Sequence, residues 1–183
     1  NNRLILIEDA AQSLGSFFPD GRHMGCVGKV GSFSFSTPKI ITTGQGGALI
    51  TDNDDIALKL RCLKDFGRTA GGNDIHDSIG YNFKFTDIQA VIGIEQMKKL
   101  KKRIKIKKAM MKLYNQQLNH LDGIHFFNQD LNCTTPWFID VMVEDREKLM
   151  VHLKKNKIGS RVMYPPINEQ KAYQIKGDFP VSS

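Results

Sequence analysis

The feature that most constrains the fold is an uninterrupted apolar run near the start of the chain, Leu4 to Ile7, which ends in the acidic pair Glu8-Asp9. A strand with one face in water alternates apolar and polar residues, whereas a continuous apolar run is typical of a strand buried on both faces of a parallel sheet. Ligands bind beyond the carboxyl ends of such strands. The run therefore predicts an α/β fold with a candidate site at Asp9.

The rest of the chain also alternates strand and helix patterns. The patterns predict strands over 30–36 and 48–51, a helix over 54–66, a long loop over 67–82 and a small β-α-β unit over 134–166. Apolar residues at helical spacing predict one long helix, straight or bent, from the N-cap Thr86 to Gly123. This alternation supports the α/β class.

The long helix separates two parts of the chain, since each helical residue adds about 1.5 Å of length. We expect a large domain over residues 1–120 and a small, incomplete α/β domain over residues 121–183. A strand buried at the centre of a sheet needs a neighbour on each side, and nothing precedes the first strand in this sequence. We therefore expect the chain to be a fragment that lacks an N-terminal half.

The net charge of +7 admits a nucleic acid or a small polyanionic substrate as partner. Much of the charge lies between Lys98 and Lys112, where apolar residues interrupt the lysines and aromatic residues that could stack on bases are few. A solvated helix face is therefore the favoured interpretation, and the alternative is an electrostatic funnel for a nucleoside diphosphate or a nucleic acid. We expect no nucleic-acid partner.

The cysteines and the hydropathy of the sequence argue against a disulfide-rich protein, a metal site and a membrane-spanning helix. The three cysteines are far apart in the sequence, which fits a reducing cytoplasm and not a disulfide framework. No Cys or His spacing is typical of a metal site, so no metal is expected. No apolar stretch approaches the roughly 20 residues of a membrane-spanning helix, so no membrane partner is expected.

Lys39 lies between the strand pattern SFSF and the glycine-rich turn TTGQGG. The ordinary interpretation is a surface lysine in a turn, whereas a lysine nucleophile must lose its proton or be held as an imine. Pyridoxal phosphate uses such a lysine, a carboxylate for its ring nitrogen, and hydroxyl or backbone N–H groups for its phosphate. Asp9, Ser34 and the turn supply these groups, an inventory that many α/β proteins share.

Three blocks of sequence, EDAAQSLGS, GSFSFSTPKIITTGQGGALIT and GYNFKFTDIQAVIGIEQMKKL, resemble in order and spacing the DegT/DnrJ/EryC1/StrS family. The segment over 158–166 also resembles the C-terminal part of that family. The resemblance implies the type I fold of aspartate aminotransferase-like enzymes, with a large mixed-sheet domain and pyridoxal phosphate as cofactor. It also implies a cytoplasmic homodimer with shared active sites.

The implied reaction moves an amino group from glutamate to a keto-deoxysugar linked to a nucleotide, for surface polysaccharide or deoxyaminosugar synthesis. Perosamine-type and viosamine-type enzymes are the nearest expectation within the family. A dehydratase of the same family is an alternative, in which histidine replaces the lysine, and the presence of Lys39 argues against it. A catalytically inactive fragment that acts as a binding protein is the other alternative.

The resemblance assigns roles to single residues. Lys39 matches the lysine that holds the cofactor as a Schiff base and shuttles a proton. Asp9 matches the acid that faces the pyridine nitrogen, and Gln12 the residue that packs against the ring near its phenolic oxygen. Ser34 matches a phosphate ligand, and Asn82 an asparagine that reaches the phosphate bound by the partner subunit.

Three further residues are candidates for contact with the substrate, namely Lys84, Tyr164 and Asn168. The chain departs from the family pattern at Gln45, where glutamate is usual, and at Asn168, near which histidine is common. These departures concern the identity of the sugar. Two alternatives from the residues alone stay open: Asp9 could cap a helical turn, and Trp137 could be a core residue of a strand.

Overall fold

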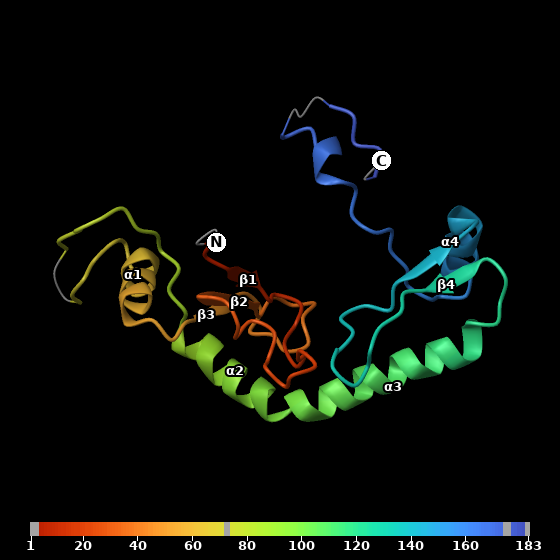
Figure 1. The fold of residues 1–183 in the computed structure, drawn as a ribbon, viewed down its shortest axis with the longest axis horizontal. Helices are drawn as coiled ribbons and strands as arrows, with labels where there is room; N and C mark the ends of the chain where they lie inside the picture. The colour runs from red at the N-terminus through yellow and green to blue at the C-terminus, as the bar shows by residue number, and fades with distance from the viewer. Residues whose placement is uncertain (1–3, 72–73, 174–176, 182–183) are drawn as a thin grey trace. The chain divides into compact units, whose positions relative to one another are not determined.

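A computed structural model of the chain describes residues 4–71, 74–173 and 177–181 (Figure 1). The chain divides into two compact units, residues 1–142 and residues 143–183. The described residues form both helices and strands, so the predicted α/β class is confirmed. The domain boundary expected near residue 120 stays a prediction.

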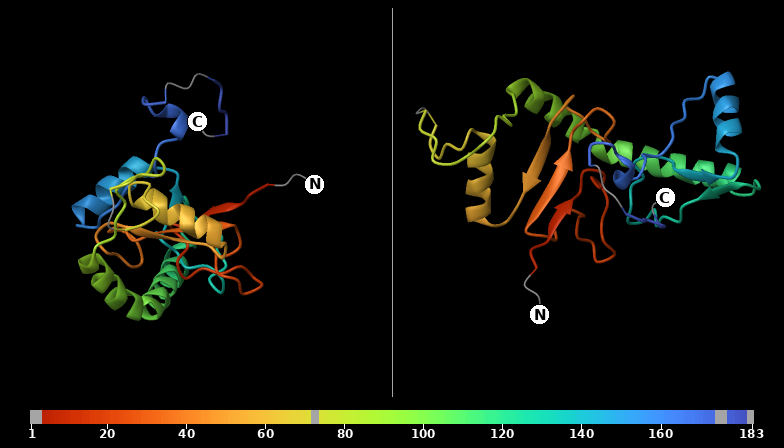
Figure 2. Two further views of the ribbon diagram at one scale, coloured as in Figure 1. Left: turned by 90° about the vertical axis from the view of Figure 1, so that its left-hand side faces the viewer. Right: turned by 90° about the horizontal axis from the view of Figure 1, so that it is seen from above.

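The first unit contains a three-stranded mixed sheet, and the right-hand view of Figure 2 shows its strands side by side. Its strands are β1 (Ile7–Asp9), β2 (Val30–Ser34) and β3 (Gly47–Ile50). β1 pairs with β2 in parallel, with Asp9 opposite Ser32, and β3 pairs with β2 antiparallel. The parallel pairing brings the carboxyl ends of β1 and β2, and with them Asp9 and Ser34, to the same edge of the sheet.

The apolar run that leads into β1 is exposed. Leu4 and Ile7 expose 86% and 65% of their surface, and Leu6 exposes 54%. The expectation of burial on both faces is therefore not met within the described residues. The reason is that β1 lies at one end of the strand order and pairs only with β2 there.

The predicted helices are present, and the longest one is broken. The helices of the first unit are α1 (Asp54–Lys64), α2 (Asp87–Lys98) and α3 (Leu100–Leu118). Thr86 caps α2 as predicted, because its hydroxyl accepts from the backbone of Gln89 while the Gln89 side chain accepts from the backbone of Thr86. The chain bends between α2 and α3 at Lys99 (Figure 1).

α3 packs against the loop that follows β1. Met111, on α3, and Ile41, after β2, are each only 1% exposed. A Cβ placed on Gly15, which has a φ of +87°, would lie 2.5 Å from Cδ1 of Ile104. Gly15 is therefore required both for its backbone conformation and for the close approach of α3.

The C-terminal part of the chain is less regular than the sequence predicts. Its elements are β4 (Ile124–Phe126), β5 (Val141–Val143), α4 (Arg146–Lys155) and a short 3₁₀ helix over Ile167–Glu169. β4 and β5 form a two-stranded sheet. The strand expected from residue 134 is reduced to β5, because Thr135 uses its backbone N–H and its hydroxyl to bind Ser16 Oγ and the Gly15 carbonyl instead. No helix among the described residues is long and apolar enough to cross a membrane.

Glu8 fixes the loop between β1 and β2. Its carboxylate accepts backbone N–H groups from Gly25 at 2.8 Å, Val27 at 2.6 Å and Gly28 at 2.5 Å. These bonds, that from Gly28 first, hold the pKa of Glu8 below its ordinary value. The ionised carboxylate therefore helps to order the loop that leads into β2.

A Glu8→Gln substitution is expected to lower the Tm of the full-length gene product at neutral pH, because an amide accepts these three donors less well. Since the folded-state pKa is lowered, the stabilisation is present above the ordinary carboxyl pKa of about 4.3 and disappears as pH falls below it. Thermal scans should therefore show a Tm difference at pH 7 that vanishes in acid. The exposed Glu144, changed to Gln, is the control, and an equal Tm loss there would contradict the assignment.

Candidate active site

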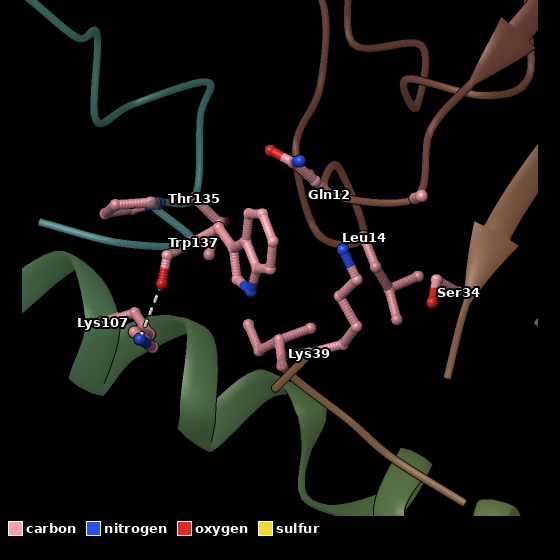
Figure 3. Close-up of a pocket in the computed structure, with 10 residues that line it drawn as sticks. Gln12, Leu14, Ser34, Lys39, Lys107, Thr135 and Trp137 are labelled. Carbon is pink, nitrogen blue, oxygen red and sulfur yellow. Dashed lines mark hydrogen bonds between the residues drawn. The ribbon is translucent and has the colours of Figure 1, made fainter. Parts of the chain in front are cut away.

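A pocket of the first unit contains three of the residues predicted for the site (Figure 3). Gln12 comes from the loop after β1, Ser34 from the end of β2, and Lys39 from the turn that follows β2. The complete lining consists of Ala11, Gln12, Leu14, Ser34, Lys39, Ile40, Lys107, Thr135, Pro136 and Trp137. The structure thus gathers residues that lie as far apart as 12 and 137 in the sequence.

Local hydrogen bonds turn the chain after β2 so that Ser34 and Lys39 reach the same pocket. The Ser34 hydroxyl accepts the backbone N–H of Ser36 at 3.3 Å and donates to Ser36 Oγ at 3.1 Å. The backbone N–H of Lys39 donates to the Ser36 carbonyl at 3.1 Å. On the other side of Lys39, Arg103 of α3 donates to the Ile40 carbonyl at 2.9 Å. Lys39 is therefore anchored from both directions along the backbone.

Asp9 ends β1 and stabilises a turn, not a helix. Its Oδ1 accepts the backbone N–H of Ala11 at 3.1 Å, and the segment after it forms turns without a helix. The alternative that Asp9 caps a helical turn is therefore wrong, because no helix follows it. Asp9 does accept the expected kind of bond from a nearby backbone N–H. The Asp9 carboxylate also acts electrostatically on Lys39, where it raises the pKa of the amine.

The amine of Lys39 is partly desolvated. Burial lowers the pKa of Lys39, and the attraction of Asp9 offsets only part of this effect, so the net shift is downward. A lowered pKa increases the fraction of neutral amine at a given pH, and the neutral amine is the form that attacks a carbonyl carbon. The pocket therefore favours nucleophilic chemistry at Nζ.

The donor set fits pyridoxal phosphate. A lysine with a lowered pKa, a carboxylate that acts on it and a hydroxyl on the same pocket are the kinds of group that this cofactor needs. The adjacent glycine-rich turn closely approaches the segment before α2, since a Cβ on Gly46 would lie 2.5 Å from the Phe85 ring. Among the described residues, no group of three or more His, Cys, Asp or Glu side chains could hold a metal ion.

Three predicted residues of the first unit, Asp9, Asn82 and Lys84, are not among the residues that line this pocket. Asn82 forms an isolated bridge with Asp65, and the Lys84 ammonium pairs with Oδ1 of the same Asp65 at 2.9 Å. Arg68 shares that carboxylate oxygen at 2.7 Å. The roles of Asn82 and Lys84 in binding phosphate and substrate stay predictions.

The two remaining candidates belong to the second unit. Tyr164 is 52% exposed, and the guanidinium carbon of Arg161 lies 4.7 Å from its ring centroid. Asn168 lies in the 3₁₀ helix over Ile167–Glu169. Their contact with a substrate stays a prediction.

For two residues of the pocket, the sequence favoured a role outside the site. Trp137 lies outside any strand and is only partly buried, which corrects the interpretation as a core residue of a strand. Lys107 belongs to the lysine run that was interpreted as a solvated face, yet its Nζ donates to the Trp137 carbonyl at 2.8 Å. Helical spacing places Lys107 one turn after Arg103, but no sequence pattern predicts a contact with a segment 30 residues away.

Comparison with known proteins identifies relatives along nearly the whole chain. The chain is 33% identical to the GDP-perosamine synthase of Escherichia coli O157:H7, over 96% of this chain and 49% of that protein. It is 30% identical to the putative pyridoxal phosphate-dependent aminotransferase EpsN of Bacillus subtilis, over 92% of this chain and 44% of that protein. The chain thus spans about half the length of the curated relatives it matches.

A solved structure shows the same architecture. The crystal structure of a DegT DnrJ EryC1 StrS aminotransferase from Brucella abortus matches 98% of this chain and 48% of that chain, with a TM-score of 0.86 and 27% identity. The predicted type I fold of pyridoxal phosphate-dependent enzymes is therefore confirmed. The predicted cofactor is confirmed at the level of the family, and EpsN is named for it.

The sequence model of one family matches nearly the whole chain, residues 1–182. That match agrees with the relatives, with the fold and with the three sequence blocks that contain Asp9, Lys39 and Asn82. The chain belongs to the DegT/DnrJ/EryC1/StrS aminotransferase family.

Proposed function

We propose that this chain provides the lysine-bearing part of a pyridoxal phosphate-dependent sugar aminotransferase. The reaction moves an amino group from glutamate to a keto-deoxysugar carried by a nucleoside diphosphate. The observation that supports it is the partly desolvated amine of Lys39, which shares a pocket with Ser34 and feels the charge of Asp9. A surface lysine in a turn would not be expected to combine these features.

The residues divide the work between them. Lys39 would hold the cofactor through Nζ and move a proton at that atom, while Asp9 would accept a hydrogen bond from the ring nitrogen. Gln12 would contact the ring, and the Ser34 hydroxyl would donate to the phosphate. The bound cofactor supplies an electron sink that a protein side chain cannot provide.

The substrate and the assembly are parts of the same proposal. The relative in Escherichia coli is named a GDP-perosamine synthase, which supports a nucleotide-linked sugar as acceptor. Surface polysaccharide is the proposed destination of the product. Two copies would share their sites in the cytoplasm, with Asn82 of each copy serving the phosphate of the other. Lys84, Tyr164 and Asn168 are the proposed contacts to the sugar nucleotide.

The proposal predicts that the full-length gene product transfers labelled nitrogen. With ¹⁵N-glutamate, pyridoxal phosphate and a GDP-linked 4-keto-6-deoxyhexose, mass spectrometry should detect the label in the sugar nucleotide and an equal amount of 2-oxoglutarate. A dehydratase would instead give a sugar that has lost a hydroxyl group and carries no label. A binding protein would leave both reactants unchanged, and either result would contradict transamination.

A further inference from the structure

The indole ring of Trp137 covers the end of the Lys39 side chain. Nζ of Lys39 lies 3.7 Å from the ring centroid, and Figure 3 shows the lysine reaching up beside the indole. A cation within about 6 Å of an aromatic face is attracted by the electrons of the ring, and tryptophan is the strongest partner of this kind. The contact therefore favours the ammonium form of Lys39, as Asp9 does, and opposes the effect of burial, which lowers the pKa of this amine.

The ring is held in this position by its own contacts. Its Nε1 donates to the carbonyl of Pro38, the residue before Lys39, at 3.0 Å. The carbonyl of Trp137 accepts from Lys107 of α3 at 2.8 Å, and the Phe138 ring stacks on the indole at 4.0 Å between centroids. The indole is thus tied to the turn that carries Lys39, so the ring and the lysine are fixed as one arrangement.

Three other charged groups lie near the turn that carries this amine. Asp9, from β1, attracts the ammonium form. Lys107, from α3, lines the same pocket, but its Nζ is engaged by the Trp137 carbonyl. Arg103, also on α3, binds the Ile40 carbonyl and Oε1 of Gln96. The ring is therefore a second attraction for the amine, independent of the carboxylate.

We propose that Trp137 is a positioning residue whose indole face holds the ammonium group of Lys39 whenever Nζ is not bonded to the cofactor. Under the proposed function, on which this purpose rests, Lys39 must leave the cofactor and return to it in each cycle. The ring keeps the released amine beside the pocket, and Asp9 balances its charge. The contact itself depends on no cofactor.

The test measures how readily Lys39 reacts, in the full-length gene product freed of cofactor. The protein is labelled with acetic anhydride across a pH series, and mass spectrometry quantifies the label at Lys39, with the exposed Lys29 as internal reference. Trp137→Leu keeps an apolar neighbour but removes the ring, so the midpoint of the Lys39 labelling curve should fall by about 0.5 to 1 pH unit. Trp137→Phe keeps an aromatic face, so in this variant the midpoint of the Lys39 labelling curve should fall by a smaller amount.

An unchanged or raised midpoint in Trp137→Leu would overturn the proposal, because the ring would then act only as a cover or not at all. If that variant fails to fold, tetrafluorotryptophan at position 137 keeps the shape and weakens the ring's attraction, so the same fall is expected and its absence would overturn the proposal equally. Neither cofactor nor substrate is present, so the outcome is independent of whether the protein is an aminotransferase.

Discussion

Lys39→Ala is expected to lower kcat for nitrogen transfer by about 10³-fold or more, since it removes both the covalent attachment point and the proton carrier of the proposed reaction. General acid–base catalysis alone contributes roughly 10²- to 10⁴-fold. The amine that is lost is the one whose pKa burial lowers. Steady-state assays with glutamate and the GDP-linked keto sugar on the full-length gene product measure the effect.

Lys29→Ala is the matched control for this substitution. Lys29 is an exposed lysine directly before β2, outside the pocket that Lys39 lines, so its loss should leave kcat unchanged. Circular dichroism of both variants checks that they fold. A Lys39→Ala protein that folds and keeps a tenth or more of the original turnover would contradict the assigned role.

Asp9→Asn is expected to lower kcat by roughly 10²- to 10³-fold, the range found when one preorganised electrostatic partner of a transition state is removed. The amide keeps the size of the side chain and an oxygen that can accept the Ala11 N–H, now seen at 3.1 Å. What the substitution removes is the negative charge that would face the ring nitrogen. The fold should therefore survive while catalysis is lost.

A second readout separates this effect from a general loss of structure. Asp9 raises the pKa of Lys39 against the lowering effect of burial, so the neutral asparagine should let the pKa of Lys39 fall further. The midpoint of the Lys39 labelling curve should then move to lower pH in Asp9→Asn. A kcat within threefold of the original value, with cofactor bound, would rule out the proposed partnership of Asp9 with the ring nitrogen.

The sequence predicted the parts of the site that depend on short-range patterns. The strand pattern around Ser34 correctly predicted β2, whereas the strand expected over Leu4–Ile7 lies at Ile7–Asp9 in the structure. Parallel pairing brings the ends of β1 and β2 together. The N-cap signal at Thr86 was also correct, because a capping box is a contact within four residues. Gln12, Ser34 and Lys39 line one pocket, and their roles toward the cofactor stay predictions.

What the sequence could not predict depends on contacts between distant segments. Trp137 binds the Pro38 carbonyl across 99 positions, and no periodicity encodes such a pair. The helical pattern of the sequence continues through Lys99, where the structure has a break between α2 and α3. The sequence therefore predicted a long helix that is either straight or bent, but not the position of the bend. The burial expected for Ile7 failed because burial depends on a neighbouring strand that a local pattern cannot supply.

The most direct test of the central claim is to reduce the pyridoxal phosphate complex of the full-length gene product with borohydride and to map the modified residue by peptide mass spectrometry. Borohydride makes the bond between the cofactor and its lysine permanent. A phosphopyridoxyl group on Lys39 at close to one per chain, absent from Lys29 and Lys107, is the predicted result. Modification spread over several lysines, or absent from Lys39, would contradict the claim that this amine is the nucleophile.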